Sequence, residues 1–371
     1  MDRQAIARRF PLVSRSRPPG LTLQARVTEL RKITQESSGL DDQKRVTRAS
    51  EVCNKAALIA SDCALPELAR ELCWRQYDAF TWASSFPVWV AKLALQPVLN
   101  IARQLIREGD GDGAYQILHQ LFYAALNRTQ AEIAGRRVGL REVTGNPGDH
   151  ELVTKLLWAA LLADGARALA LAGRWQEAAE HAAKNRGVGT RLLDGRQVTI
   201  LALVDRGQLD QAVSMVRDSV AAEPWEEAVA SLLHVYCQCA AGADTEQSVI
   251  VMIRHALGIV EQADPSTTVF RTRIGITALD LAGDYDSALL QRLRQAVISE
   301  SASDVYVGRE ALAHPELLPM MTVKQRQGLE ALVQESGLGC GSMPQDLLED
   351  LMSSVTMAER RLQQVCSGSP R

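Results

Sequence analysis

The most constraining feature of this chain is a glycine followed five residues later by an alanine, a pattern that recurs along its length. Gly173 and Ala178 form one copy, and Gly207 and Ala212 form a second copy 34 residues later. A helical hairpin needs a residue that tolerates a positive φ where its first helix ends, and a small residue where the two backbones approach. The spacing occurs again in Gly109/Ala114 and Gly283/Ala288, with a looser copy in Gly242/Ser248. The pattern therefore predicts an all-α protein built from repeated helical hairpins.

The composition favours closely packed helices over a core built on aromatic rings. Hydrophobic residues make up 46% of the 371 residues and aromatic residues only 5%, so Ala, Leu and Val must supply most of the packing. A chain of this length could form two or three ordinary domains or one elongated solenoid, and the repeats favour the solenoid. The formal net charge of -3 indicates no overall attraction to nucleic acid or to an anionic membrane.

The cysteines and the apolar segments indicate a cytoplasmic protein. No cysteine lies in a CxxC motif or in a Cys/His cluster with zinc-ligand spacing. No segment approaches the ~20 apolar residues that cross a bilayer. The arginines near the N-terminus lack the apolar run of a secretory signal. We therefore expect reduced thiols, no metal, no cofactor and no membrane partner.

Changes in patterning divide the chain into five regions. Residues 1–20 are rich in arginine and proline, and we expect them to form a disordered basic arm. Helical periodicity dominates residues 21–127 and again residues 150–300, which contain the best repeats. Between them, the glycine-rich segments of residues 128–149 predict a short hairpin or an ordered loop. Residues 301–371 lack the glycine/alanine spacing, and we expect their helices to cap the array.

Residues 158–220 resemble tetratricopeptide (TPR) repeats, whose unit is about 34 residues long. In this resemblance Ala178 and Ala212 occupy the small position, and the helices before Gly173 and Gly207 are the first helices of their hairpins. The resemblance implies a TPR-like superhelix whose groove binds a peptide or protein, as in scaffolding, chaperone-type or regulatory repeat proteins. The less regular glycine spacing elsewhere leaves a HEAT-like or otherwise irregular α-solenoid as an alternative.

A polar stripe on an otherwise apolar helix is the first candidate binding site. Its members recur at steps of four, four and three residues, which places them on one helix face. They are Lys92, Gln96, Asn100 and Arg103, with Arg75 and Gln76 on the preceding helix as further candidates. Such a stripe either faces bulk solvent or lines a concave groove, where it would bind a peptide backbone or a carboxylate.

The linker between two repeats is the second candidate binding site. It contains Asn185, Arg191 and Arg196, together with two glycines near the start of a helix. Free backbone N–H groups and arginines in such a place could hold a phosphate or a carboxylate. The alternative is a turn ended by glycine, with solvated arginines.

The residues contain no motif for catalysis. The histidines are isolated, and no cysteine or serine lies in a recognisable nucleophile motif, so we predict no catalytic residues. We expect an intracellular protein that binds a peptide or protein segment in a regulatory or adaptor role, and apolar caps would permit a homodimer. The alternative is a helical enzyme or biosynthetic-pathway accessory protein with a small anionic ligand in the groove. A nucleic-acid-binding solenoid is a third option, which the balanced charge disfavours.

Overall fold

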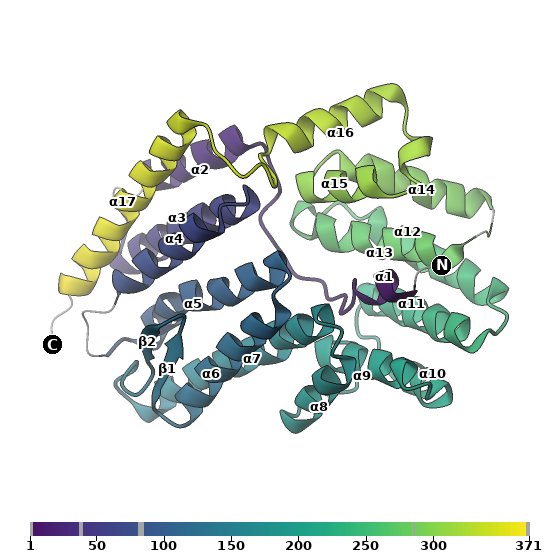
Figure 1. Ribbon diagram of the computed structural model, residues 1–371, viewed down its shortest axis with the longest axis horizontal. Coiled ribbons are helices and arrows are strands. Elements are labelled where there is room, and N and C mark those ends of the chain that lie inside the picture. Colours follow the sequence, from purple (N-terminus) through teal and green to yellow (C-terminus); the bar gives the residue numbers. More distant parts are fainter. Residues whose placement is uncertain (1–2, 37–39, 81–84, 284, 286, 369–371) are drawn as a thin grey trace. The chain divides into compact units, whose positions relative to one another are not determined.

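Helices form almost all of the regular structure in the computed structural model of this chain (Figure 1). The structure describes residues 3–36, 40–80, 85–283, 285 and 287–368. The chain divides into two compact units, which we name after a central helix of each. The α3 unit consists of Thr22–Ala168 with Gly337–Arg371, and the α13 unit of Met1–Leu21 with Leu169–Ser336. The prediction of an all-α protein is confirmed.

The helices follow one another as the periodicity predicts. The α3 unit contains α2 (Leu23–Gln35), α3 (Asp42–Asp62), α4 (Pro66–Asp78), α5 (Val88–Glu108), α6 (Gly111–Leu126) and α17 (Gln345–Gly368). Helix α7 (Pro147–Leu171) begins in this unit and ends in the other. The α13 unit contains α1 (Arg3–Ala7), α8 (Trp175–Lys184), α9 (Asp194–Asp205), α10 (Leu209–Arg217), α11 (Pro224–Ala241), α12 (Glu246–Val260), η1 (Pro265–Thr267), α13 (Thr268–Ala282), α14 (Ala288–Ser301), α15 (Val305–Ala313), η2 (Leu318–Met320) and α16 (Val323–Glu335). Within the described ranges, no helix is both long and apolar enough to span a membrane.

The glycines of the repeated pattern lie in the turns between helices, as predicted. Their φ angles lie between 55° and 90°, where a side chain would strain the backbone; they are Gly109, Gly173, Gly207, Gly242 and Gly283. The paired alanines at 114, 178 and 212 are fully buried. The copy after Gly283 differs, because Ser287 caps α14 and the exposed Ala288 is the first residue of that helix. At that turn the first fully buried side chain of α14 is Leu290.

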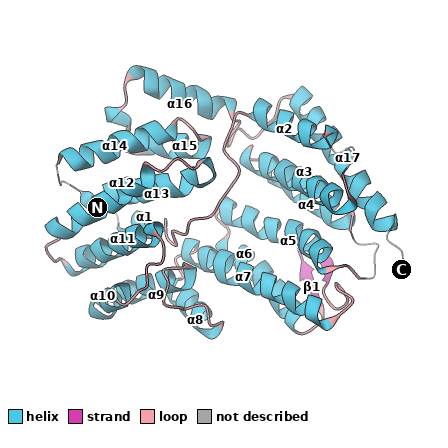
Figure 2. Cartoon of the chain, turned by 180° about the vertical axis from the view of Figure 1, so that it is seen from behind, coloured by secondary structure: helices cyan, strands magenta, loops and turns pink. Residues whose placement is uncertain are grey.

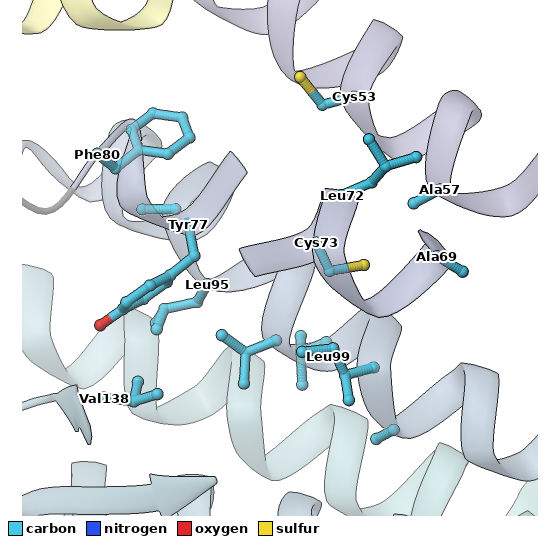
Figure 3. Packing of buried hydrophobic residues seen from close by; sticks show 14 of the residues in the cluster. Cys53, Ala57, Ala69, Leu72, Cys73, Tyr77, Phe80, Leu95, Leu99 and Val138 are labelled. Atoms are coloured by element: carbon cyan, nitrogen blue, oxygen red, sulfur yellow. The ribbon is translucent and has the colours of Figure 1, made fainter. Parts of the chain in front are cut away.

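The core of the α3 unit forms around α3, which packs against α2, α4, α5 and α17. Figure 3 shows part of this core, to which the large side chains of Leu72 and Leu99 and the small ones of Ala57 and Ala69 all belong. Burial raises the pKa of the Cys73 thiol to about 12, so the thiol stays protonated at neutral pH. Cys73, which is 1% exposed, is therefore a core residue.

The C-terminal helices do not form a single cap, contrary to the prediction for residues 301–371. Helices α15 and α16 belong to the α13 unit, whereas α17 packs against α2 and α3. Gly339 N donates to Asp62 O at 2.7 Å, and Gly341 N donates to Cys63 O at 2.9 Å. These bonds tie the returning chain to the end of α3, and the apolar face of α17 then covers helices near the start of the chain.

Residues 130–139 form the predicted hairpin, shown in magenta in Figure 2. Its strands, β1 (Gln130–Ile133) and β2 (Arg136–Gly139), pair antiparallel with Ile133 opposite Arg136. Ala134 and Gly135 in the two-residue turn both have positive φ, as the mirror-image turns of tight hairpins require. The Arg136 guanidinium lies 4.5 Å from the centre of the Trp74 ring on α4, so a cation–π contact holds the hairpin against that helix.

Helix α13 packs so closely against its neighbours that Gly275 leaves no room for a side chain. A Cβ there would lie 2.5 Å from Val297 of α14 and 2.9 Å from Val260 of α12. We expect Gly275→Ala to lower the free energy of unfolding of the α13 unit by about 1–3 kcal/mol through overpacking. Gly258→Ala on α12 places its methyl group in open space and should stabilise by up to about 1 kcal/mol. Equal denaturant midpoints for the two variants would contradict this packing.

The N-terminal residues do not form the predicted disordered arm. Ile6, Phe10 and Leu12 are buried in the core of the α13 unit, and α1 packs against α13. Residues 12–20 then continue without helix or strand, as the purple trace in Figure 1 shows. The arginine-rich composition suggested a solvated segment. Burial of these three apolar side chains and ion pairs between the arginines and carboxylates stabilise the N-terminal segment. Together they offset the entropic cost of ordering it.

Candidate functional site

The predicted stripe on α5 forms a connected polar network in the α3 unit. Gln96 Nε2 donates to Asn100 Oδ1 at 3.0 Å, and Arg103 donates to the same oxygen at 3.2 Å. Asn100 Nδ2 donates in turn to Asn54 Oδ1 on α3 at 2.8 Å. Arg103 Nε donates to an Asp164 oxygen on α7 at 2.9 Å. The network therefore joins α3, α5 and α7, and of these α3 and α5 are the first helices of the hairpins α3–α4 and α5–α6.

The other predicted site residues of this unit, Lys92, Arg75 and Gln76, differ in how far an external ligand can reach them. Lys92 is exposed on α5. Arg75 makes two hydrogen bonds of 2.8 Å to the Glu359 carboxylate on α17, so its guanidinium is already occupied. Gln76 is fully buried and donates to Ser50 O at 3.4 Å. Arg75 and Gln76 thus stabilise helix packing and do not join the α5 network.

The arginines of the second candidate site hold the linker in place. Arg191 donates to both carboxylate oxygens of the buried Glu226 at 3.0 and 2.9 Å. Arg196 is 9% exposed and donates to one serine hydroxyl and two backbone carbonyls at 2.7–2.9 Å. Asn185 donates to a backbone carbonyl of α8 at 2.9 Å. All three side chains form hydrogen bonds within the α13 unit, and these bonds account for their conformations without a bound anion.

The N-terminal segment lies on the α13 unit as a peptide held through its backbone. Leu12 N donates to Gln197 Oε1 at 2.7 Å, and Gln197 Nε2 donates back to Leu12 O at 2.8 Å. Further along, Arg17 N donates to Ser266 O at 2.9 Å. Gly20 N donates to an Asp304 carboxylate oxygen at 2.7 Å, and the following residue of α15 donates to Gly20 O at 3.0 Å. The segment is thus bound at three backbone positions by different elements.

Side chains of the same segment are bound between the backbone contacts. Arg9 forms an ion pair with Asp280 of α13. Arg15 forms one with Asp194 of α9, with Nη2 and Oδ2 2.6 Å apart. The Arg17 guanidinium lies 3.9 Å from the centre of the Tyr306 ring. Arg9, Arg15 and Arg17 of this segment therefore each meet an acidic or aromatic partner, on either side of the buried Phe10 and Leu12.

Asp280 is the carboxylate at which the N-terminal segment and the end of α15 meet. His314 Nε2 donates to Asp280 Oδ1 at 3.0 Å, because Nδ1 of the same ring accepts from the Glu316 backbone N–H. Burial alone would raise the pKa of Asp280. The His314 hydrogen bond and the Arg9 charge outweigh burial and hold that pKa below its ordinary value.

We expect the stabilising contribution of Asp280 to be present at neutral pH and lost as the pH falls below about 4. The sign follows because a carboxyl whose pKa is lowered in the folded state favours folding above its ordinary pKa. Thermal midpoints of the wild type and of Asp280→Asn measure the effect, and they should differ at pH 7 and converge as the carboxyl is protonated. A difference independent of pH would show that the Asp280 charge does not contribute.

The surface that holds the N-terminal segment is formed by the first helices of hairpins, as are the α3 and α5 parts of the α5 network. Gln197 and Asp194 lie on α9, Asp280 lies on α13, and Asp304 caps α15. Each of these helices is the first of its hairpin, and we call this surface the first-helix face. The local sequence does not identify these four residues, because their partners lie 179–284 residues away in the chain. The available signal was the apolar Phe10 and Leu12 within an arginine-rich segment.

No family model, curated protein or solved structure matches this chain. Its class therefore follows from the fold, which is that of an all-α protein of packed helical hairpins. Among the residues that the structure describes, no three His, Cys, Asp or Glu side chains are grouped so as to hold a metal ion.

Proposed function

We propose that this chain is an intracellular, TPR-like protein that binds a peptide or protein segment in a regulatory or adaptor role. The observation that carries the proposal is the course of residues 5–20. They lie as a peptide on the first-helix face of the α13 unit, bound through both backbone and side chains. A surface with these groups provides what peptide recognition requires, namely main-chain hydrogen bonds for affinity and apolar sites for specificity.

The α5 network favours a peptide ligand over a small anion. Arg103 is already paired with Asp164 at 2.9 Å, and Arg75 and Arg191 are paired with glutamates. The amide groups of the stripe both donate and accept hydrogen bonds, which matches the alternating N–H and C=O groups of a peptide backbone. An anion-binding enzyme or accessory protein therefore has less support, and a nucleic-acid-binding role loses the basic arm that favoured it.

Selection of a random peptide library on the full chain tests the proposal. We expect enriched peptides to bind Asn100→Ala/Arg103→Ala at least about tenfold more weakly than the wild type. The physical reason is that the double variant removes the Asn100 amide and the Arg103 side chain that positions it, and each hydrogen bond to the peptide that is lost costs about 0.5–1.5 kcal/mol. About 1.4 kcal/mol is a factor of ten in affinity. Titration of labelled peptides by fluorescence anisotropy measures the change.

The matched control is Gln116→Ala/Gln120→Ala, which removes two exposed polar side chains from the second helix α6. It should bind the same peptides with wild-type affinity. Equal affinity of both double variants would place the binding site away from the α5 network. A selection that enriches no peptide would contradict the proposed function. Thermal midpoints of the variants establish that they are folded.

A further inference from the structure

We infer that residues 5–20 are an intramolecular ligand of the α13 unit, and that the external partner of this surface is a basic peptide of the same chemistry that displaces them. The inference rests on the proposed function and adds the class of ligand and the mode of regulation. Three features carry it: the reciprocal backbone contacts, the charge of the surface, and the absence of regular secondary structure in residues 12–20.

The backbone contacts show how the surface recognises a peptide. The fully buried Gln197 uses its carbonyl and its amide to bind both backbone groups of Leu12, which is the pairing that a neighbouring β-strand would provide. Asp304, 2% exposed, accepts from the Gly20 N–H. If the segment dissociated and nothing replaced it, the buried Gln197 amide and Asp304 carboxylate would lose hydrogen-bond partners. Leaving a buried polar group unsatisfied is destabilising. The structure therefore favours exchange of one peptide for another.

The side-chain contacts define the class of the external peptide. Residues 3–20 contain no Asp or Glu, and their arginines meet Asp280 and Asp194 on the first-helix face. Between the arginines, Phe10 and Leu12 flank a proline and are both 3% exposed. The matching ligand is an extended peptide with an apolar–Pro–apolar core between arginines. An acidic peptide would meet like charges at Asp280 and Asp194.

The contacts also explain how the segment would regulate binding. It has few internal hydrogen bonds, and its arginines stay partly open to solvent, with side-chain exposures of 21% for Arg9 and 37% for Arg15. A tethered ligand acts at an effective concentration on the order of millimolar. An external peptide must compete with this tethered segment. The segment therefore sets the affinity or concentration that the external peptide needs in order to bind.

The test uses a fluorescein-labelled peptide with the sequence of residues 3–20 and the full chain. In Phe10→Ala/Leu12→Ala the chain's own segment is weakened while the receiving surface is unchanged. We expect this variant to bind the probe at least about tenfold more tightly than the wild type, because less of the surface is occupied. Adding Gln197→Ala to it should reduce binding at least about tenfold. A probe with Arg9→Glu and Arg15→Glu should not compete.

A second variant keeps the test decisive if the loss of apolar contacts unfolds the α13 unit. Arg9→Glu/Arg15→Glu retains the apolar side chains and repels Asp280 and Asp194, and both positions are partly exposed. It should also bind the unmodified probe more tightly than the wild type. Wild-type dimers that the probe dissociates would likewise support the inference, since the segment would then be exchanged between copies.

The outcome that overturns the inference is specific to this surface. If folded wild type and both variants bind the probe equally, or none binds it, residues 5–20 are a fixed structural strap. Peptides that depend on Asn100 and Arg103 would still support the proposed function in that case. If no library peptide depends on Asn100 and Arg103, but the variants bind the probe tightly, the α5 site is rejected and the peptide-binding surface of the α13 unit is retained.

Discussion

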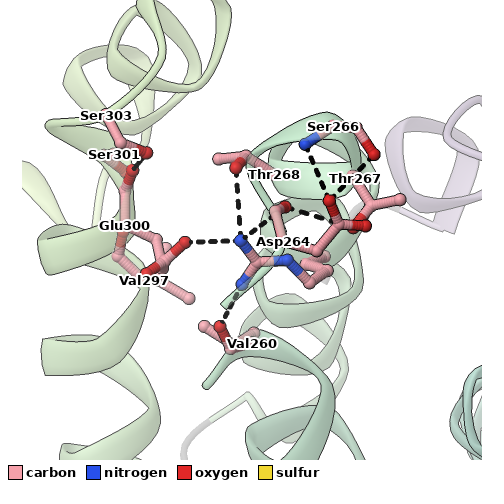
Figure 4. A network of polar contacts seen from close by, with 10 residues as sticks. Val260, Asp264, Ser266, Thr267, Thr268, Val297, Glu300, Ser301 and Ser303 are labelled. Atoms are coloured by element: carbon pink, nitrogen blue, oxygen red, sulfur yellow. Dashed lines mark hydrogen bonds and ion pairs between the residues drawn. The ribbon is translucent and has the colours of Figure 1, made fainter. Parts of the chain in front are cut away.

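Arg271→Met is expected to destabilise the α13 unit by about 3–5 kcal/mol, because it leaves a buried set of acceptors without their donor. The Arg271 side chain is 3% exposed and donates to a Glu300 oxygen on α14 at 2.8 Å. It also donates to the backbone carbonyls of Val260 and Asp264 and to the Thr268 hydroxyl, as Figure 4 shows. One guanidinium thus joins the end of α12, η1, α13 and α14. Amide hydrogen exchange of α12–α14 measures the loss within this unit.

Arg273→Met on the same helix is the matched control. Arg273 pairs with Glu310 at 3.1 Å, but its side chain is 41% exposed, and exposed pairs contribute about 0–1 kcal/mol. The two variants remove the same charge from positions two residues apart. Equal losses of protection would show that burial of the Arg271 network does not determine its contribution.

Asp62→Ala is expected to destabilise the α3 unit by a similar amount, about 3–5 kcal/mol. Arg26 Nη2 of α2 lies 2.6 Å from Asp62 Oδ2 at the end of α3, and the two side chains are 8% and 4% exposed. Removing the carboxylate leaves a buried guanidinium without this counter-charge. The expected signature is a large loss of hydrogen-exchange protection in α2 and α3, with little change in the α13 unit.

Two further variants separate burial from charge at this position. Asp350→Ala removes the partner of Arg31 on α2, an exposed pair 3.0 Å apart, and should cost at most about 1 kcal/mol. Arg26→Met/Asp62→Leu replaces the buried pair by apolar side chains and should recover much of the loss, because no charge remains to be desolvated. A double variant as unstable as Asp62→Ala would contradict this explanation.

The helices and their turns follow from the sequence because they depend on local rules. Apolar residues at helical spacing and a glycine at a position of positive φ require only neighbouring residues. The expected non-helical insertion at residues 128–149 contains the β1–β2 hairpin. The copy at Ala288 differs because α14 begins five residues after Gly283, where the capping Ser287 sets its start, whereas α8 and α10 begin two residues after their glycines.

The candidate site is predictable only in part, for the same reason. Spacings of three and four residues place Gln96, Asn100 and Arg103 on one helix face, and the structure joins them by hydrogen bonds. Their partners Asn54 and Asp164 come from other helices. Arg75 and Arg191 have the composition of a binding site, yet each has a glutamate partner distant in sequence. A side chain's charge does not reveal whether the fold supplies a counter-charge.

The sequence by itself determined the all-α class, the hairpin turns and the polar face of α5. Only the tertiary structure decided that residues 5–20 pack on the α13 unit, that α17 returns to α2 and α3, and that most predicted arginines are internally paired. The difference is physical. Helix formation and turn geometry are set within a few residues, whereas burial and ion pairing depend on which distant surfaces the chain brings into contact.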